Sequence, residues 1–247
     1  MKKLIIIGES HTRSFTYREN VLPFFMGNGK NINLSTKNIS TINNKIKTIL
    51  STINKENSII FLFLGEPNCR YPLKNSWDPH WDEIRKKKTV KPLVDIEHIT
   101  KCIENLSKID LSNIDYILTP TGAYDPVIPA LNKFNELLRD KFKDKVIDIF
   151  SNTIDDDLKV LDIYKAKNWV KDPIHLNSKI SEDLLLILKN KNLINSIEDY
   201  KSKIDGYFGT HLPSKFGTFN RQGGFDGSKI TLSKFGSYII KIEVINK

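Results

Sequence analysis

Three side chains from distant parts of the chain could together activate an alcohol for attack on an ester. Ser10 follows an apolar run at 4–7 and a glycine, and Asp172 and His175 stand three residues apart far downstream. Ester cleavage by a serine needs an imidazole to take the hydroxyl proton, a carboxylate to orient it, and donors for the oxyanion. The sequence therefore predicts a triad of Ser10, His175 and Asp172. The alternative interpretation of Ser10 is that it only caps the helix that follows.

The elements around these residues alternate between strands and helices. Uninterrupted apolar runs at 4–7 and 59–64 are typical of buried strands, and each ends in a glycine followed by polar residues. Further strands are expected at 31–34, 114–119 and 145–150, and amphipathic helices over 39–53, 96–109, 125–142 and 181–189. This alternation predicts an α/β fold, a three-layer α/β/α sandwich. Ligands bind such sheets at the carboxyl ends of the strands, where Ser10 lies.

The composition changes at about residue 200. Glycines and aromatic residues gather at 206–209, 216–217 and 223–225, and the run at 238–245 partly alternates. We therefore predict an α/β domain over 1–200 and a small β-rich C-terminal extension over 201–247, packed on it. The acidic run at 155–157 is interpreted as the solvated start of a helix. Three adjacent carboxylates do not converge on one ion, so no metal is expected.

Charge and cysteine content narrow the classes of function. The chain has 247 residues, 39% of them hydrophobic, and a formal net charge of +9 that is diffuse apart from the basic run at 85–88. A diffuse excess is typical of solvated surface, so nucleic-acid binding through that run is only a minor alternative. Two cysteines without paired spacing predict neither a disulfide framework nor a zinc site. No stretch has the length of a signal peptide's apolar region or of a membrane span, so we expect a cytoplasmic protein.

The motifs resemble those of the SGNH (GDSL-like) hydrolase superfamily. The first block reads Gly8-Glu9-Ser10-His11, and the last reads Asp172-Pro173-Ile174-His175, followed by the Leu-Asn pair common in such proteins. The resemblance covers roughly residues 1 to 190 and implies a flavodoxin-like parallel sheet. It also implies that Ser10 is the nucleophile, His175 the base and Asp172 its orienting partner.

The third block departs from the superfamily's Gly-x-Asn-Asp pattern. It reads Gly65-Glu66-Pro67-Asn68-Cys69-Arg70, with the asparagine one place later, and looks like a variant branch with Gly-Glu-x-Asp-Cys-Arg. The resemblance implies an oxyanion hole formed by Ser10, by Gly27 or Gly29, and by Asn68. Arg70 is expected either to anchor an anionic substrate or to pair with Glu66.

The Ser10-His11 pair is similar to that of members that add or remove acyl groups on carbohydrates. This favours a carbohydrate O-acetyl esterase acting on a small-molecule or glycan ester, without a cofactor. An O-acyltransferase would use the same triad with an acyl donor such as acetyl-CoA, and a non-catalytic glycan-binding module is the third possibility. Substrate contacts are predicted from the following residues, for which simple packing or a solvated loop position is the alternative: His11, Arg70, Trp77, Trp81 and His211.

Overall fold

The computed structural model describes four stretches of the chain in full and some C-terminal strands as backbone. The full stretches are 1–27, 32–70, 93–165 and 174–202. The backbone strands are β6 (Thr218–Phe219), β7 (Phe225–Asp226), β8 (Ile230–Phe235) and β9 (Ile239–Val244). Five residues with a predicted role, and the basic run at 85–88, lie outside the described residues: Gly29, Trp77, Trp81, Asp172 and His211.

Five parallel strands form the centre of the sheet. They are β1 (Lys3–Gly8), β2 (Val21–Phe25), β3 (Ser58–Phe63), β4 (Tyr116–Leu118) and β5 (Val146–Ile147), and they lie in the order β5-β4-β3-β1-β2. This is the flavodoxin-like order, so the predicted α/β class is confirmed. On the side of β2 away from β1, the antiparallel strands β9 and then β8 continue the same sheet. β6 and β7 pair separately.

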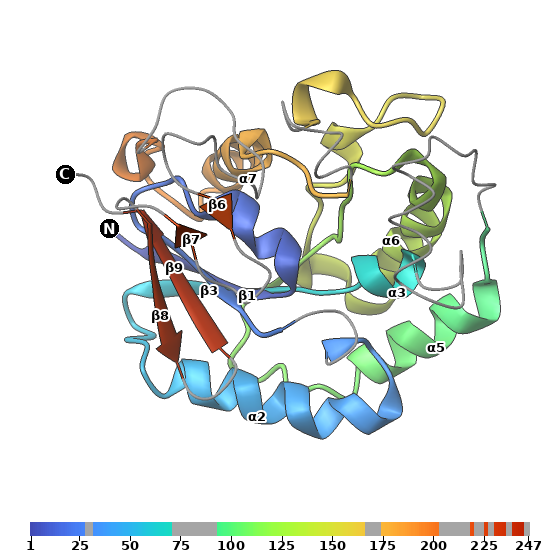
Figure 1. Cartoon of the computed structure of the whole chain (residues 1–247), viewed down its shortest axis with the longest axis horizontal. Coiled ribbons are helices and arrows are strands. Elements are labelled where there is room, and N and C mark those ends of the chain that lie inside the picture. The colour runs from blue at the N-terminus through green and yellow to red at the C-terminus, as the bar shows by residue number, and fades with distance from the viewer. Residues whose placement is uncertain are drawn as a thin grey trace.

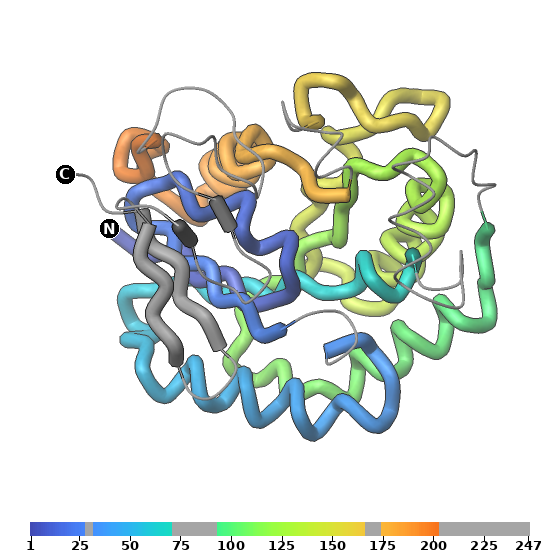
Figure 2. The backbone as a smooth tube through the Cα atoms, viewed as in Figure 1, coloured from blue at the N-terminus to red at the C-terminus, as the bar shows by residue number. Residues whose placement is uncertain are grey.

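Helices cover both faces of this sheet. The α-helices are α2 (Ile39–Leu50), α3 (Glu66–Arg70), α5 (Ile96–Leu106), α6 (Ile128–Phe142) and α7 (Lys179–Asn190). In Figure 1, α2 and α5 lie below the strands and α7 lies above them. The short helix η1 (Ser10–Phe15) packs against α7, and Figure 2 shows these two segments, in blue and orange, side by side. The expected three layers are therefore present.

Short 3-10 helices connect many of these elements. They are η2 (Thr36–Asn38), η4 (Asp125–Val127), η5 (Lys143–Lys145), η6 (Ser151–Thr153), η7 (Asp162–Tyr164) and η8 (Glu198–Tyr200). No helix in the described part of the chain is both long and apolar enough to cross a membrane.

The central strands β1 and β3 pack without any gap between their backbones. Every residue of β3 is buried, as are all those of β1 after Lys3. A Cβ added at Gly8 would lie 2.0 Å from the carbonyl oxygen of Phe63, so no other residue fits at the end of β1. β1 and β3 therefore lie close together at the point where the chain leaves the sheet toward Ser10.

The second strand differs from the prediction. It is Val21–Phe25, not 31–34, although Pro23 lies inside it. Pro23 pairs with Ile6 of β1, and β9 pairs only with the two residues that follow Pro23, so the missing N–H costs little at this position. Near the expected strand, the Leu34 N–H donates to the Asn68 side chain, at 3.1 Å.

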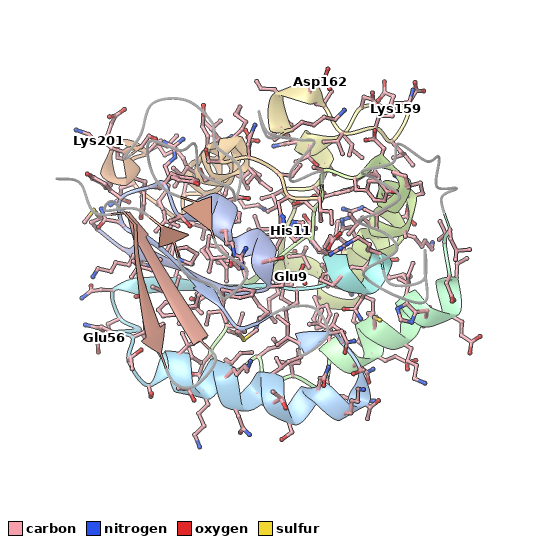
Figure 3. All side chains as sticks on the ribbon, in the orientation of Figure 1. Glu9, His11, Glu56, Lys159, Asp162 and Lys201 are labelled. Carbon is pink, nitrogen blue, oxygen red and sulfur yellow. The ribbon has the colours of Figure 1, made fainter. Side chains whose placement is uncertain are left out.

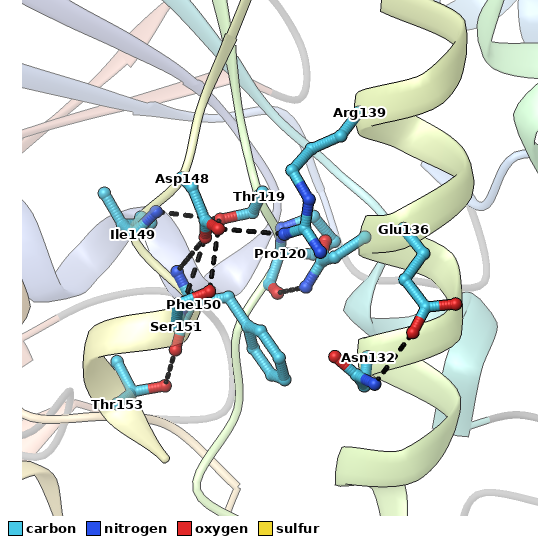
Figure 4. A network of polar contacts seen from close by, with 11 residues as sticks. Thr119, Pro120, Asn132, Glu136, Arg139, Asp148, Ile149, Phe150, Ser151 and Thr153 are labelled. Atoms are coloured by element: carbon cyan, nitrogen blue, oxygen red, sulfur yellow. Dashed lines mark hydrogen bonds and ion pairs between the residues drawn. The ribbon is translucent and has the colours of Figure 1, made fainter. Parts of the chain in front are cut away.

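The strand β5 is shorter than the predicted 145–150 because side chains take over its hydrogen bonds. Thr119 Oγ1 accepts the N–H groups of Ile149 and Phe150, and Asp148 accepts from Phe150, from Ser151 and from Thr119 itself. Figure 4 shows this network. The acidic run at 155–157 also differs from the prediction: it forms a turn rather than a helix start, because Asp155 accepts two later backbone N–H groups.

Candidate active site

The fold brings Ser10 and His175 into direct contact. His175 Nε2 lies 2.7 Å from Ser10 Oγ, although the residues are 165 positions apart. Ser10 is half-buried, and His175 is 9% exposed. Ser10 follows β1, the strand at which the order of the sheet reverses, and this is where ligands bind in open α/β sheets. The carboxylate of the predicted triad, Asp172, lies outside the described residues.

Hydrogen bonds on both sides of His175 hold its segment in place. The Ile174 carbonyl accepts from the Ala123 N–H at 2.7 Å, and the Leu176 carbonyl accepts from Ser14 Oγ at 2.7 Å. One bond comes from the loop after β4 and the other from η1. His175 is therefore positioned by the loop after β4 and by η1.

Asn177 fixes the next part of the same segment. Its side-chain amide donates to the carbonyls of Ile163 and Lys165, and its own N–H donates to the Tyr164 carbonyl. This gives a structural role to the Leu-Asn pair that follows the histidine in the sequence.

The backbone N–H groups of Ser10 and Gly27 lie beyond the carboxyl ends of the adjacent strands β1 and β2. Gly8 pairs with Phe25 across the parallel strands, and the Met26 N–H donates to the Gly8 carbonyl, so Gly27 and Ser10 follow at the same end of the sheet. Gly27 has φ +142°, a conformation that favours glycine. Within the described residues neither N–H donates to an acceptor.

The Asn68 side-chain amide is engaged at both ends by other groups, which corrects the sequence-based expectation that it donates to the oxyanion. Its Oδ1 accepts the Leu34 N–H, and its Nδ2 lies 3.3 Å from Cys102 Sγ. Both ends of the amide are therefore used to join α3 to the segment before α2 and to α5. Pro67, the residue before Asn68, has neither a side-chain donor nor a backbone N–H to offer.

A buried cluster of charged side chains lies directly behind Ser10. Arg70 contacts both oxygens of Glu66, at 2.7 and 2.9 Å, which realises the second of the two roles expected for Arg70. His11 Nε2 lies 3.2 Å from Glu66 Oε2, although the angle is not that of an aligned hydrogen bond. Glu9 Oε1 accepts the Glu66 N–H at 3.1 Å. None of the four is more than 6% exposed, and Figure 3 shows Glu9 and His11 deep in the interior.

The two carboxyl groups of this cluster differ sharply in their affinity for protons. Burial alone would raise the pKa of Glu66, but Arg70 and His11 outweigh it and hold that pKa far below its ordinary value. Burial, and then the charge of Glu66, raise the pKa of Glu9 well above its ordinary value. Burial and the charge of Glu66 thus favour the protonated form of Glu9, whereas Arg70 and His11 favour the carboxylate form of Glu66.

The same cluster does not fit a metal ion. One ligand atom from each of Glu9, His11 and Glu66 lies within 4.8 Å of the others, which is close enough for shared coordination. However, the Arg70 guanidinium already contacts both oxygens of Glu66, and its positive charge would repel a cation there. The donor set is suited to an internal ion pair.

The loop after β4 packs against the buried Glu66–Arg70 pair, and the sequence-based prediction did not include its residues. Tyr124 is buried, which raises the pKa of its phenol to about 12, while nearby Arg70 acts in the opposite direction. A Cβ at Gly122 would lie 3.4 Å from Glu66 Cγ, so this loop packs closely on α3. The sequence could have indicated this loop only by its position, since it follows a predicted parallel strand and so lies at the same edge of the sheet as Ser10.

Comparison with known proteins adds no relative: no family model, no curated protein and no solved structure matches this chain.

Proposed function

We propose that this protein is a serine-dependent acyl-ester hydrolase of the carbohydrate O-acetyl esterase type. The observation that carries the proposal is the 2.7 Å contact between Ser10 Oγ and His175 Nε2 at the switch point of the sheet. A serine within hydrogen-bond reach of an imidazole is the basic requirement for an activated nucleophile. The carbohydrate substrate class rests on the similarity of the Ser10-His11 pair to the SGNH members that modify sugars.

The proposed reaction has two steps. First, His175 Nε2 takes the proton of Ser10 as Oγ attacks the carbonyl carbon, and the N–H groups of Ser10 and Gly27 stabilise the oxyanion. The sugar alcohol then leaves with the proton from His175, which gives acyl-Ser10. Second, water attacks this ester after losing its proton to His175, and the acid departs as Ser10 regains a proton. Asp172 is the proposed partner that orients His175.

A non-catalytic glycan-binding module is the second candidate. The engagement of Asn68 away from Ser10, and the proline at the preceding position, favour it. Loss of one oxyanion donor typically lowers a rate by about 100- to 1000-fold. If Asn68 supplies no donor, the first proposal predicts a slower enzyme than a site with a third donor would give, and the second predicts no enzyme.

Covalent labelling separates these candidates. We expect a fluorophosphonate to label the wild-type protein at one site, and Ser10→Ala and His175→Ala to abolish or greatly slow the labelling. Ser107→Ala is the matched control, because Ser107 is exposed at the end of α5 and its hydroxyl donates to the Glu104 carbonyl of the same helix. Labelling retained in Ser10→Ala would refute the enzymatic proposal.

Turnover of p-nitrophenyl acetate provides the second readout. Wild-type turnover above that of Ser10→Ala supports catalysis, whereas equal rates favour the binding module. If turnover is seen, adding an oligosaccharide and measuring its mass distinguishes hydrolysis from acyl transfer, since only a transferase adds an acyl group to the sugar.

A further inference from the structure

His11 faces the interior of the protein rather than the substrate. Its side chain is 2% exposed, and its Nε2 is turned toward Glu66. A group this deeply buried does not bind a sugar directly, so the substrate contact predicted from the sequence is corrected here.

The His11 ring packs against the ring of His175. The two centroids are 4.5 Å apart, with planes tilted by 47°, and the Phe63 ring lies nearly perpendicular to that of His11, with the centroids 6.4 Å apart. His175 is the residue whose Nε2 meets Ser10. The orientation of the proposed base therefore depends on a neighbouring ring that is itself enclosed.

The other side of His11 is anchored by the buried ion pair. Glu66 contacts His11 and holds Arg70 through both of its oxygens, and the Glu66 N–H donates to Glu9. Thr12 in turn donates its N–H and its hydroxyl to the Glu9 carbonyl. These contacts join η1 to α3 and leave His11 little freedom to rotate.

We propose that His11 is a positioning residue for His175, held in place by the Glu66–Arg70 pair. This inference rests on the proposed esterase activity and deepens it. The proposed contact with Asp172 would orient one edge of the His175 ring, and the packed His11 ring restricts its tilt from the face. By packing there, His11 keeps His175 Nε2 directed at Ser10 Oγ, and its removal gives the ring room to tilt away. A misplaced catalytic group of this kind costs about 100-fold in rate.

Inactivation kinetics with a fluorophosphonate test this role. We expect His11→Gln, which loses the ring, to lower the maximal inactivation rate by about 10- to 100-fold with an unchanged half-saturating concentration, because orientation rather than binding is affected. His11→Phe keeps a ring of similar shape and should stay within about threefold of the wild type. His98→Gln is the matched control: the same exchange on α5, at a half-buried histidine that contacts the Asn68 carbonyl.

The outcomes decide the matter. Wild-type kinetics in His11→Gln would overturn the inference, and so would equal losses in His11→Gln and His11→Phe. If His11→Gln fails to fold by circular dichroism, His11→Phe decides alone: near wild-type inactivation supports the inference, and a loss of more than about tenfold overturns it. An unlabelled wild-type protein would instead refute the proposed function, and this inference with it.

Discussion

Replacing Glu66 with glutamine removes the negative charge from the buried pair that joins α3 to the candidate active site. Glu66 is fully buried and Arg70 is 6% exposed, so water cannot compensate for the lost partner. Glutamine has nearly the same shape, and the change therefore isolates the charge. The Arg70 guanidinium would be left with one neutral acceptor in place of a carboxylate held at 2.7 and 2.9 Å.

The expected cost follows from the burial of both groups. Removing one partner of a buried ion pair typically lowers the free energy of unfolding by about 3–5 kcal/mol. For a domain of this size that corresponds to a fall in Tm of about 6–20 °C. Because its folded-state pKa is lowered, Glu66 stabilises the fold above its ordinary pKa of 4.5, and this contribution is lost as the pH falls below that value. The gap between wild type and Glu66→Gln should therefore narrow in acid.

Urea unfolding at pH 7, followed by far-UV circular dichroism, measures this cost. Glu136→Gln is the matched control, because Glu136 pairs with Lys133 at 2.9 Å but both side chains are exposed, at 43% and 36%. Exposed pairs contribute about 0–1 kcal/mol, so the control should unfold almost like the wild type. If Glu66→Gln were no less stable than Glu136→Gln, the buried pair would not hold α3 in place as described.

Three further predictions concern the neighbouring residues. Glu9→Gln should gain stability relative to the wild type as the pH rises above 4.5, because folded wild-type protein must keep Glu9 protonated or bury its charge. The difference in the free energy of unfolding should grow by about 1.4 kcal/mol per pH unit until the raised pKa of Glu9 is passed. A pH-independent difference in urea midpoints would contradict this. Asn68→Ala should lower the free energy of unfolding by about 1–3 kcal/mol, because the buried Leu34 N–H loses its acceptor. The fluorophosphonate labelling rate should stay within about twofold of the wild type. A loss of about 100-fold would instead indicate that Asn68 stabilises the oxyanion. Gly65→Ala should lower the free energy of unfolding by at least about 1–3 kcal/mol, since Gly65 has φ +133° and an added Cβ would lie 2.7 Å from the Phe134 ring. Gly122→Ala is the control in the same thermal melting experiment, because its added Cβ would lie 3.4 Å from the nearest atom and should be tolerated.

Local patterns in the sequence were sufficient for the class of fold. The runs at 4–7 and 59–64 are typical of buried strands, and apolar residues three and four apart indicate the helices α2, α5, α6 and α7. Pattern alone failed at β2, where Pro23 interrupts the apolar run and the strand was predicted at 31–34 instead. The tolerance of this proline depends on which neighbour pairs with which residue, and that is a property of the assembled sheet.

For the candidate site, too, some features could be predicted from the sequence and others depend on the fold. Residue type and order pointed to Ser10 and His175, because a serine after a buried strand and a downstream histidine are visible in one dimension. Only the tertiary structure shows that they meet at 2.7 Å, that Asn68 turns toward Cys102, and that His11 lies between Glu66 and His175. The direction of a side chain depends on partners that are distant in sequence, and spacing along the chain carries no information about them.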